Sequence, residues 1–207
     1  MPVYVSRHPL VLHKVTLLRE RQTEPKFFRE LVAELASLLF IEASHDLRLE
    51  PHTVETPLAR CEGGQLVERV GIVPILRAGL GMAEPLLRVL PSAVVWHLGL
   101  YRDHATHQPV WYYDKLPGSA NIDVAMVVDP MLATGGSVVA ATSRLKKWGV
   151  PRVKFIGLIA APEGVHALQR AHPEVDIHLA ALDSHLNEKC YIVPGLGDAG
   201  DRQFGTE

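Results

Sequence analysis

The stretch VVDPMLATGGS, residues 127–137, decides the fold of this chain because it holds the end of a strand and the start of a helix. An apolar run ends at Asp129, and the small residues TGGS at 134–137 lead into an amphipathic segment. Glycines let the backbone approach a ligand, and the unpaired amides and the dipole at the start of a helix attract an anion. The stretch therefore predicts a strand, a loop and a helix that together bind a phosphate monoester. The alternative is a tight turn that Ser137 caps and that binds nothing.

On both sides of this stretch, apolar runs alternate with amphipathic segments of helical length. This alternation is typical of an α/β domain in which helices cover both faces of a mostly parallel sheet. We expect one domain, residues 1–207, with an N-terminal extension at about 1–50, an arm or lid at about 103–118 and a C-terminal tail at about 183–207. Strands are expected at 52–58, 69–76, 93–100, 123–128, 153–161 and 175–182, and helices at 24–45, 82–90, 137–148 and 162–171.

The composition argues against a protein that binds nucleic acid or spans a membrane. Acidic residues number 23 against 21 Lys plus Arg, so the chain has no overall basic character. No apolar run reaches the roughly 18 residues that cross a bilayer, and the N-terminus lacks the pattern of a signal peptide. Two distant cysteines, Cys61 and Cys190, fit a reduced compartment. We therefore expect a cytoplasmic protein.

Metal ligands of the protein itself are not expected. His104 and His107 are a close pair among eleven histidines, but no cysteine or carboxylate stands at ligand spacing beside them except the adjacent Asp103. A histidine metal site remains the less favoured reading of this polar segment.

Three charged residues follow predicted strands. Asp129, Arg77 and Arg102 each come directly after an apolar run, and ligands of such sheets lie outside the carboxyl ends of the strands. A guanidinium matches phosphate oxygens, so the two arginines together suggest a second phosphate site. Asp129 could reach the hydroxyls of a sugar phosphate. The alternatives are a strand-end cap for Asp129 and a surface ion pair for each arginine.

Three stretches together resemble the type I phosphoribosyltransferases, in the form found in the uracil phosphoribosyltransferase family. VVDPMLATGGS resembles the loop that binds phosphoribosyl diphosphate, PILRAGLGM (74–82) the diphosphate loop, and YIVPGLGDAGDRQFGT (191–206) the segment that binds uracil. The resemblance extends from about residue 5 to the end. It implies the Rossmann-like core of that family, with a β-arm and a C-terminal base-binding segment.

The resemblance also implies roles for single residues. Catalysis would depend on Asp129, Arg77, Arg102 and Asp198, and backbone at Ile192, Gly197, Asp198 and Ala199 would read uracil. Phosphoribosyl diphosphate (PRPP) would be bound by Arg77, Arg102, Asp129, Pro130, Met131, Leu132, Ala133, Thr134, Gly135, Gly136, Ser137 and Asp198.

The implied activity is transfer of the phosphoribosyl group from PRPP to N1 of uracil, giving UMP and diphosphate. Mg²⁺ would bridge diphosphate and ribose oxygens, GTP could act as an effector, and the chain would form a homodimer or a higher assembly. Many type I enzymes carry acids where this chain has Pro130 and Ala133. The loop therefore offers no obvious general base for uracil.

Two further segments leave alternatives open. The glycine-rich tail suits backbone recognition of a flat base, but it could instead be disordered. Trp111, Tyr112 and Tyr113 belong either to a lid or to a dimer contact. Rival functions on the same fold are a regulatory protein that binds RNA or DNA and a transferase for another base such as a purine.

Overall fold

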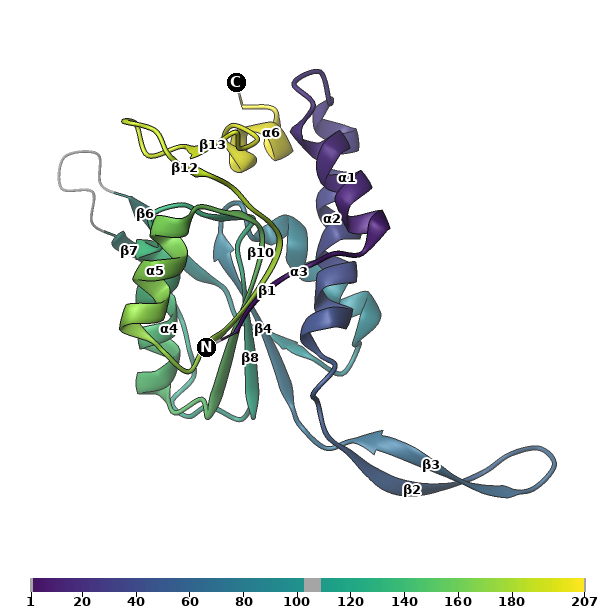
Figure 1. The fold of residues 1–207 in the computed structure, drawn as a ribbon. Coiled ribbons are helices and arrows are strands. Elements are labelled where there is room, and N and C mark those ends of the chain that lie inside the picture. The colour runs from purple at the N-terminus through teal and green to yellow at the C-terminus, as the bar shows by residue number, and fades with distance from the viewer. Residues whose placement is uncertain (1, 103–108, 207) are drawn as a thin grey trace.

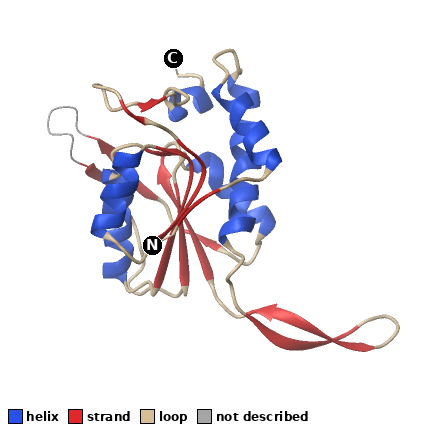
Figure 2. Cartoon of the chain, in the orientation of Figure 1, coloured by secondary structure: helices blue, strands red, loops and turns tan. Residues whose placement is uncertain are grey.

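The computed structural model describes residues 2–102 and 109–206, and one central sheet carries helices on both faces (Figures 1 and 2). The side chains of Arg102 and Pro109 lie outside the described part. The elements in chain order are β1 (Val3–Val5), α1 (Pro9–Arg19), α2 (Pro25–Ala43), β2 (Leu49–Glu55), β3 (Arg60–Leu66), β4 (Val70–Leu76), α3 (Leu80–Val89), β5 (Val94–Val95), β6 (Leu98–Arg102), β7 (Pro109–Asp114), β8 (Val124–Val128), β9 (Met131–Leu132), α4 (Gly136–Trp148), β10 (Arg152–Ala160), α5 (Pro162–Ala171), β11 (Asp176–Leu182), β12 (His185–Leu186), β13 (Ile192–Val193) and α6 (Ala199–Phe204).

The main sheet follows the strand order β1-β11-β10-β8-β4-β6-β7. Neighbouring strands along this path are parallel except β6 and β7, and the short strands β5 and β9 pair in parallel with β4 and β10. The strands β4, β8 and β10 are buried along nearly their whole length, as continuous apolar runs predict for a sheet covered on both sides. The predicted α/β domain with a mostly parallel sheet is confirmed.

Two hydrophobic cores lie on the two faces of this sheet. Successive residues of a strand point to opposite faces, so each buried strand contributes to both cores. In β4, Ile72 packs with residues of α1, α2 and α3, whereas Val73 packs with residues of α4 and α5. The N-terminal extension is thus part of the core, because α1 and α2 cover one face (Figure 1).

The observed elements differ from the predicted ones at several boundaries. Helix α1 was not predicted, although Val11, Val15 and Leu18 bury one of its faces. The expected strand 93–100 is two short strands that pair with different parts of β4. The Thr23 hydroxyl donates to the Leu17 carbonyl at 2.7 Å and does not cap α2.

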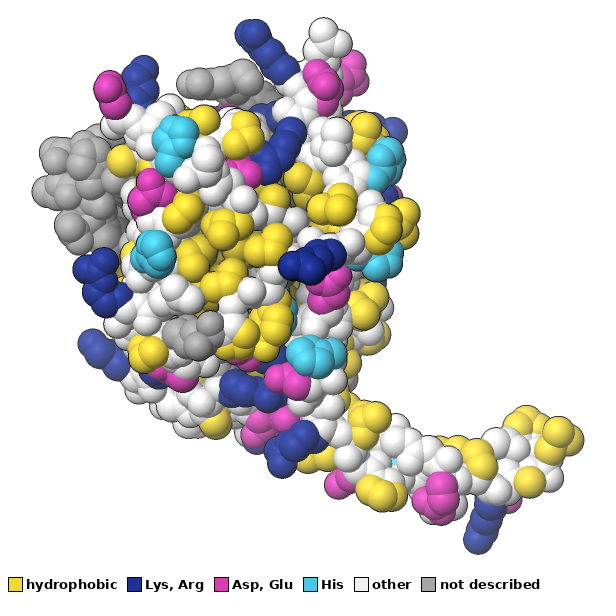
Figure 3. Space-filling model, viewed as in Figure 1, with side chains coloured by type: hydrophobic (Ala, Val, Ile, Leu, Met, Phe, Trp, Pro, Cys, Tyr) yellow, Lys and Arg dark blue, Asp and Glu magenta, His cyan; other side chains and the backbone are white. Residues whose placement is uncertain are grey.

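A long hairpin projects from the body of the molecule. Strands β2 and β3 pair antiparallel over their full length, and almost all of their side chains are exposed (Figures 1 and 3). The sequence predicted only a short strand at 52–58 here and placed an arm at 103–118. In that second region β7 pairs antiparallel with β6 at the sheet edge, and residues 103–108 lie outside the described residues.

No helix in the described ranges, 2–102 and 109–206, is long and apolar enough to cross a membrane.

Candidate active site

The carboxyl ends of the central strands meet at one edge of the sheet, beneath the segment that contains β12, β13 and α6 (Figure 1). The loops that follow β4 and β8 touch there. A Cβ added to Gly79 would lie 2.4 Å from the carbonyl oxygen of Val128, so only glycine fits between the two loops. The first two sequence motifs are therefore adjacent, as the positions of the strands predict.

Gly135 forms the turn that starts α4. Its φ of 82° lies in the left-handed region, which glycine adopts most readily, and its carbonyl accepts the first helical hydrogen bond from Val139 at 2.9 Å. The helix begins at Gly136 and no side chain caps it. Ser137 is therefore not the cap that the alternative reading required. The first amides of α4 have no partner within the helix and can attract an anion.

Gly164 of α5 supports the same loop from behind. A Cβ at Gly164 would lie 2.4 Å from the carbonyl oxygen of Ala133 and 2.6 Å from that of Leu132, and a Cβ at Gly135 would lie 2.8 Å from the Gly164 carbonyl. The loop and the first turn of α5 thus pack backbone against backbone. Sequence analysis missed Gly164, and the only signal was a glycine inside a predicted helix.

Asp129 sits at the end of β8 with an altered acidity. Burial raises the pKa of its carboxyl to about 7; the amide of Met131 lowers it, and the negative charge of Asp198 raises it further. The Met131 amide donates to Oδ1 over a long 3.4 Å. This weak cap leaves most of the acceptor capacity of Asp129 available to the hydroxyls of a ligand.

Arg77 follows β4 and reaches toward the tail. Its Nη2 lies 3.6 Å from Oδ1 of Asp201, and its side chain is 63% exposed. The surface ion pair that was the alternative for Arg77 is thus present in part, yet the guanidinium still faces solvent and can bind phosphate oxygens. The side chain of Arg102, the other predicted partner, lies outside the described residues.

The tail is folded, which contradicts the alternative of a disordered segment. Ile192 and Ala199 are buried, whereas Gly197 and Asp198 are exposed. The carboxylate of Asp198 accepts a hydrogen bond of 3.0 Å from the Asp201 amide and so caps α6. Of the residues predicted to read uracil, Ile192 therefore lies in β13, Ala199 begins α6, and Gly197 and Asp198 lie in the turn between them.

Gln203 joins the tail to the diphosphate loop. Its side chain is fully buried, and its Nε2 donates to the carbonyls of Ala78 and Ala199, each at 3.0 Å. A Cβ at Gly81 would lie 2.1 Å from its Oε1, so a larger residue at Gly81 would force the buried Gln203 side chain to shift. The third motif therefore meets the second as well as the first.

Helix α1 supplies the other support of the tail, and no sequence pattern indicated it. The Arg19 guanidinium donates to the Asp183 carboxylate at 2.8 and 2.5 Å. The Arg202 guanidinium donates to carbonyls of Leu18 and Leu196 at 2.8 and 2.9 Å. These arginines fasten the tail to the end of α1.

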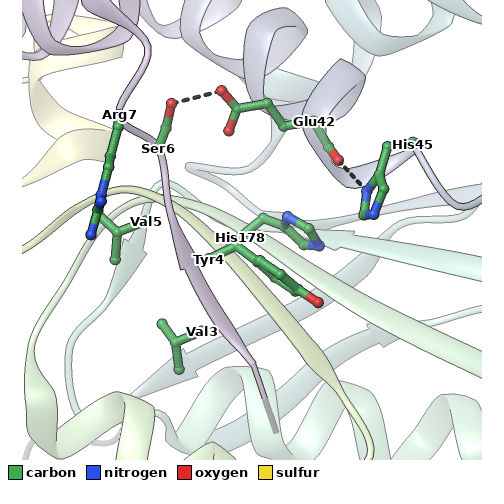
Figure 4. Close-up of a pocket in the computed structure, with 8 residues that line it drawn as sticks. All are labelled: Val3, Tyr4, Val5, Ser6, Arg7, Glu42, His45 and His178. Carbon is green, nitrogen blue, oxygen red and sulfur yellow. Dashed lines mark hydrogen bonds between the residues drawn. The ribbon is translucent and has the colours of Figure 1, made fainter.

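A separate groove of about 610 Å³ lies along the free edge of β1 (Figure 4). The ring of Tyr4 stacks on that of His178, whose pKa is lowered to about 4 chiefly by burial. None of the residues that line this groove belongs to the three motifs. The predicted site residues thus gather elsewhere, at the carboxyl ends of the strands.

Known proteins are similar to this chain in sequence and in fold. The model of the uracil phosphoribosyltransferase family matches residues 5–206. The uracil phosphoribosyltransferase of Roseiflexus castenholzii is 66% identical over 204 residues, with 99% of this chain and 98% of that protein covered. The uracil phosphoribosyltransferase of Halalkalibacterium halodurans is 56% identical over 206 residues, with 99% of each chain covered.

Solved structures agree. The AQ2163 protein of Aquifex aeolicus superposes with a TM-score of 0.94 at 38% identity and covers 100% of this chain and 99% of its own. A hypoxanthine-guanine phosphoribosyltransferase of Bacillus anthracis reaches a TM-score of 0.51 at 11% identity, with 77% and 80% of the two chains covered, and so shows a shared fold alone. The chain belongs to the uracil phosphoribosyltransferase family.

Proposed function

We propose that this chain transfers the phosphoribosyl group of PRPP to N1 of uracil, which yields UMP and diphosphate in pyrimidine salvage. The observation that carries the proposal is the meeting of three loops at one edge of the sheet. Gly79 lies against the backbone of Val128, and Arg77 lies 3.6 Å from Asp201 of the tail. A reaction between a sugar diphosphate and a flat base needs sites for phosphate, diphosphate and base side by side.

The two ends of the sugar phosphate would be held by different groups. The loop 133–137 offers backbone amides, and the hydroxyls of Thr134 and Ser137, to the 5-phosphate. Asp129 would orient the ribose hydroxyls with its carboxylate. Arg77 and Arg102 would bind the diphosphate and stabilise its charge as it leaves.

Mg²⁺ would reach this site together with the substrate. Within the described part of the chain, no three side chains of His, Cys, Asp or Glu are grouped so as to hold a metal. Asp129 and Asp198 lie close enough to interact electrostatically, and carboxylate oxygens are ligands that Mg²⁺ prefers. These residues fit an ion held mainly by diphosphate and ribose oxygens. When bound, the ion would neutralise charge on the leaving diphosphate.

The chain's own groups would act mainly by positioning. The bond between ribose C1 and diphosphate loosens first, and N1 of uracil then attacks the cationic carbon. Correct placement of two reactants can supply up to roughly 7–11 kcal/mol of the barrier. Pro130 and Ala133 provide no proton acceptor, so the proton of N1 would pass to a diphosphate oxygen or to solvent rather than to a side chain at these two positions.

The cationic centre needs protection from water. The segment 103–118 is our candidate for a cover, and exposed aromatic rings of Trp111, Tyr112 and Tyr113 on β7 favour either that role or a contact between two copies.

A homodimer or higher assembly and a GTP effector belong to the same proposal. Rates that do not respond to added GTP would remove the effector.

The direct test is product formation. The purified protein is mixed with PRPP, Mg²⁺ and labelled uracil, with cytosine and hypoxanthine in parallel reactions and a chelator as a further control. We expect labelled UMP from uracil alone and none with the chelator. Product from hypoxanthine would indicate a purine transferase. No product from any base, together with salt-dependent binding of RNA, would indicate a regulatory protein.

A further inference from the structure

We propose that Arg19 and Asp183 are positioning residues for the base: they fix the main chain at Gly195 so that residues 197–199 present their backbone to uracil in one place. The inference rests on the proposed function and deepens it, because it assigns the specificity of the tail to an ion pair outside the three motifs. Neither residue needs to touch the substrate.

Asp183 is the fixed point of this arrangement. It follows β11, and its own amide donates to the carbonyl of Ala160 at 2.8 Å, which ties it to the neighbouring strand β10. Its side chain is only 5% exposed. Its Oδ2 accepts a hydrogen bond of 2.9 Å from the amide of Gly195. The base-binding segment is thereby attached to the rigid sheet.

Arg19, the last residue of α1, completes the contact from the other side. Its Nη1 donates to Oδ2 of Asp183 and to the carbonyl of Gly195, both at 2.8 Å, and its Nη2 donates to Oδ1 of Asp183 at 2.5 Å. Both polar groups of the Gly195 backbone are therefore held. A planar guanidinium can make these three bonds at once, whereas an ammonium group lacks the fixed fork.

The backbone conformation at Gly195 requires a glycine. Its φ is 65°, and a Cβ there would lie 2.0 Å from the carbonyl oxygen of Ile192. The next carbonyl, that of Leu196, accepts from Arg202 at 2.9 Å, and the Arg202 guanidinium lies 4.4 Å from the ring of Phe28. The exposed residues Gly197 and Asp198 follow directly after these held groups.

This arrangement explains how backbone could discriminate between bases. Uracil donates a hydrogen bond from N3 and accepts one at the oxygen on C4, whereas cytosine accepts at N3 and donates from the amino group on C4. A backbone that distinguishes the two patterns must stay in one place. If it shifts slightly, either base can find hydrogen-bond partners in it. Neither Arg19 nor Asp183 contacts the diphosphate loop in the described hydrogen bonds and ion pairs. Their loss should therefore affect the base more than the sugar diphosphate.

The test compares Arg19→Lys and Arg19→Met with a matched control. Lys14→Met removes another ion pair of α1, with Glu34 at 2.6 Å, and its side chain is as buried as that of Arg19 (22% against 23% exposed). This control loosens α1 on α2 without touching the tail. For each protein we would measure melting temperature, KM for uracil, KM for PRPP, and the ratio of kcat/KM for uracil to that for cytosine.

We expect Arg19→Lys to remain folded and to raise KM for uracil by roughly tenfold, since the hydrogen bond to the Gly195 carbonyl and the paired bonds to Asp183 are lost or weakened. The preference for uracil over cytosine should fall, and KM for PRPP should stay within about twofold of wild type. Arg19→Met should show the same split more strongly. Lys14→Met should lower the melting temperature and leave both KM values and the base preference unchanged.

The results that would contradict the positioning role can be told apart from one another. If Arg19→Lys is folded but keeps the wild-type KM for uracil and the wild-type base preference, the positioning role is wrong. An equal rise of both KM values, or the same change in Lys14→Met, would mean that Arg19 acts only through stability. A wild-type protein that does not convert uracil would instead overturn the proposed function itself. If Arg19→Met does not fold, Arg19→Lys alone decides.

Discussion

Asp129 and Asp198, which come from different motifs, lie close enough for their charges to interact: burial raises the pKa of Asp129 to about 7, and the negative charge of Asp198 contributes to the rise. The end of β8 and the start of α6 thus share an electrostatic site, although 69 positions separate them in the sequence. A carboxyl group with this pKa changes its charge near neutral pH, and this gives the first prediction.

The contribution of Asp129 to the stability of the substrate-free protein should fall as pH rises from about 4 to about 7, while that of buried His178, whose pKa is lowered to about 4, changes in the opposite direction. In this range folded Asp129 keeps a proton that the unfolded chain, with a pKa near 3.8, has already released. The Asp129 contribution to the free energy of unfolding therefore falls with pH, by about 1.4 kcal/mol for each unit of pKa difference. Asp129→Asn removes this dependence. Urea denaturation of both proteins between pH 4.5 and pH 8 measures it, and a stability difference that is constant with pH would contradict it.

Asp198→Asn should cut turnover and preserve the fold. Asparagine caps a helix as well as aspartate does, so α6 keeps its hydrogen bond from Asp201. The loss of the negative charge should also lower the pKa of Asp129, so any change of rate that follows Asp129 moves to lower pH. Steady-state rates between pH 5 and pH 9, with circular dichroism as the check on folding, test both effects. A wild-type turnover number would mean that Asp198 has no part in the reaction.

Gly164→Ala should weaken PRPP binding although Gly164 lies outside every motif. The new methyl group would meet the carbonyl oxygens of Ala133 and Leu132 at 2.4 and 2.6 Å, and backbone cannot move aside cheaply. We expect a loss of stability of about 1–3 kcal/mol, as for other overpacked sites. KM for PRPP should rise more than KM for uracil. Gly63→Ala, on the projecting hairpin, is the control, since its Cβ would meet only an ordinary contact of 3.5 Å.

Arg77→Ala and Arg102→Ala should each raise KM for PRPP and slow the reaction by more than about tenfold, because a charge-assisted contact with the diphosphate is lost. The fold should tolerate Arg77→Ala, since its ion pair with Asp201 is long and its side chain is 63% exposed. Inorganic diphosphate binding, followed by calorimetry, separates this effect from catalysis. Unchanged affinity for inorganic diphosphate in both variants would contradict the proposal that these two arginines bind the diphosphate.

Local patterns predicted most of the sheet and the helices that follow it. Helix α5 spans 162–171 as predicted, because Pro162 suits the first turn and one face is apolar. The hairpin β2–β3 was missed because strands exposed on both faces show no alternation between apolar and polar residues. Helix α1 was missed for another reason: its apolar face is narrow, with only Val11, Val15 and Leu18 buried, and the sequence predicts no more than an N-terminal extension there.

The candidate site likewise contains residues that local sequence predicts and residues that it does not predict. Motif residues such as Asp129, Arg77 and Asp198 could be proposed from local sequence, and the structure brings them to one edge of the sheet. The residues that support them could not. Arg19 and Asp183 are 164 positions apart, and an isolated arginine and aspartate carry no sign that they will meet. Such partners are determined by the packing of the whole fold.

The parallel edge strand β1 has a consequence for how the chain is made. Val3, Tyr4 and Val5 pair with Ile177, His178 and Leu179 of β11. During synthesis the N-terminal elements leave the ribosome first, but their partners in the sheet and in the tail are translated last. The edge of β1 must therefore remain unpaired until nearly all of the polypeptide has emerged, although α1 can already pack on α2. Chains arrested before β11 should bind chaperones and be degraded rapidly.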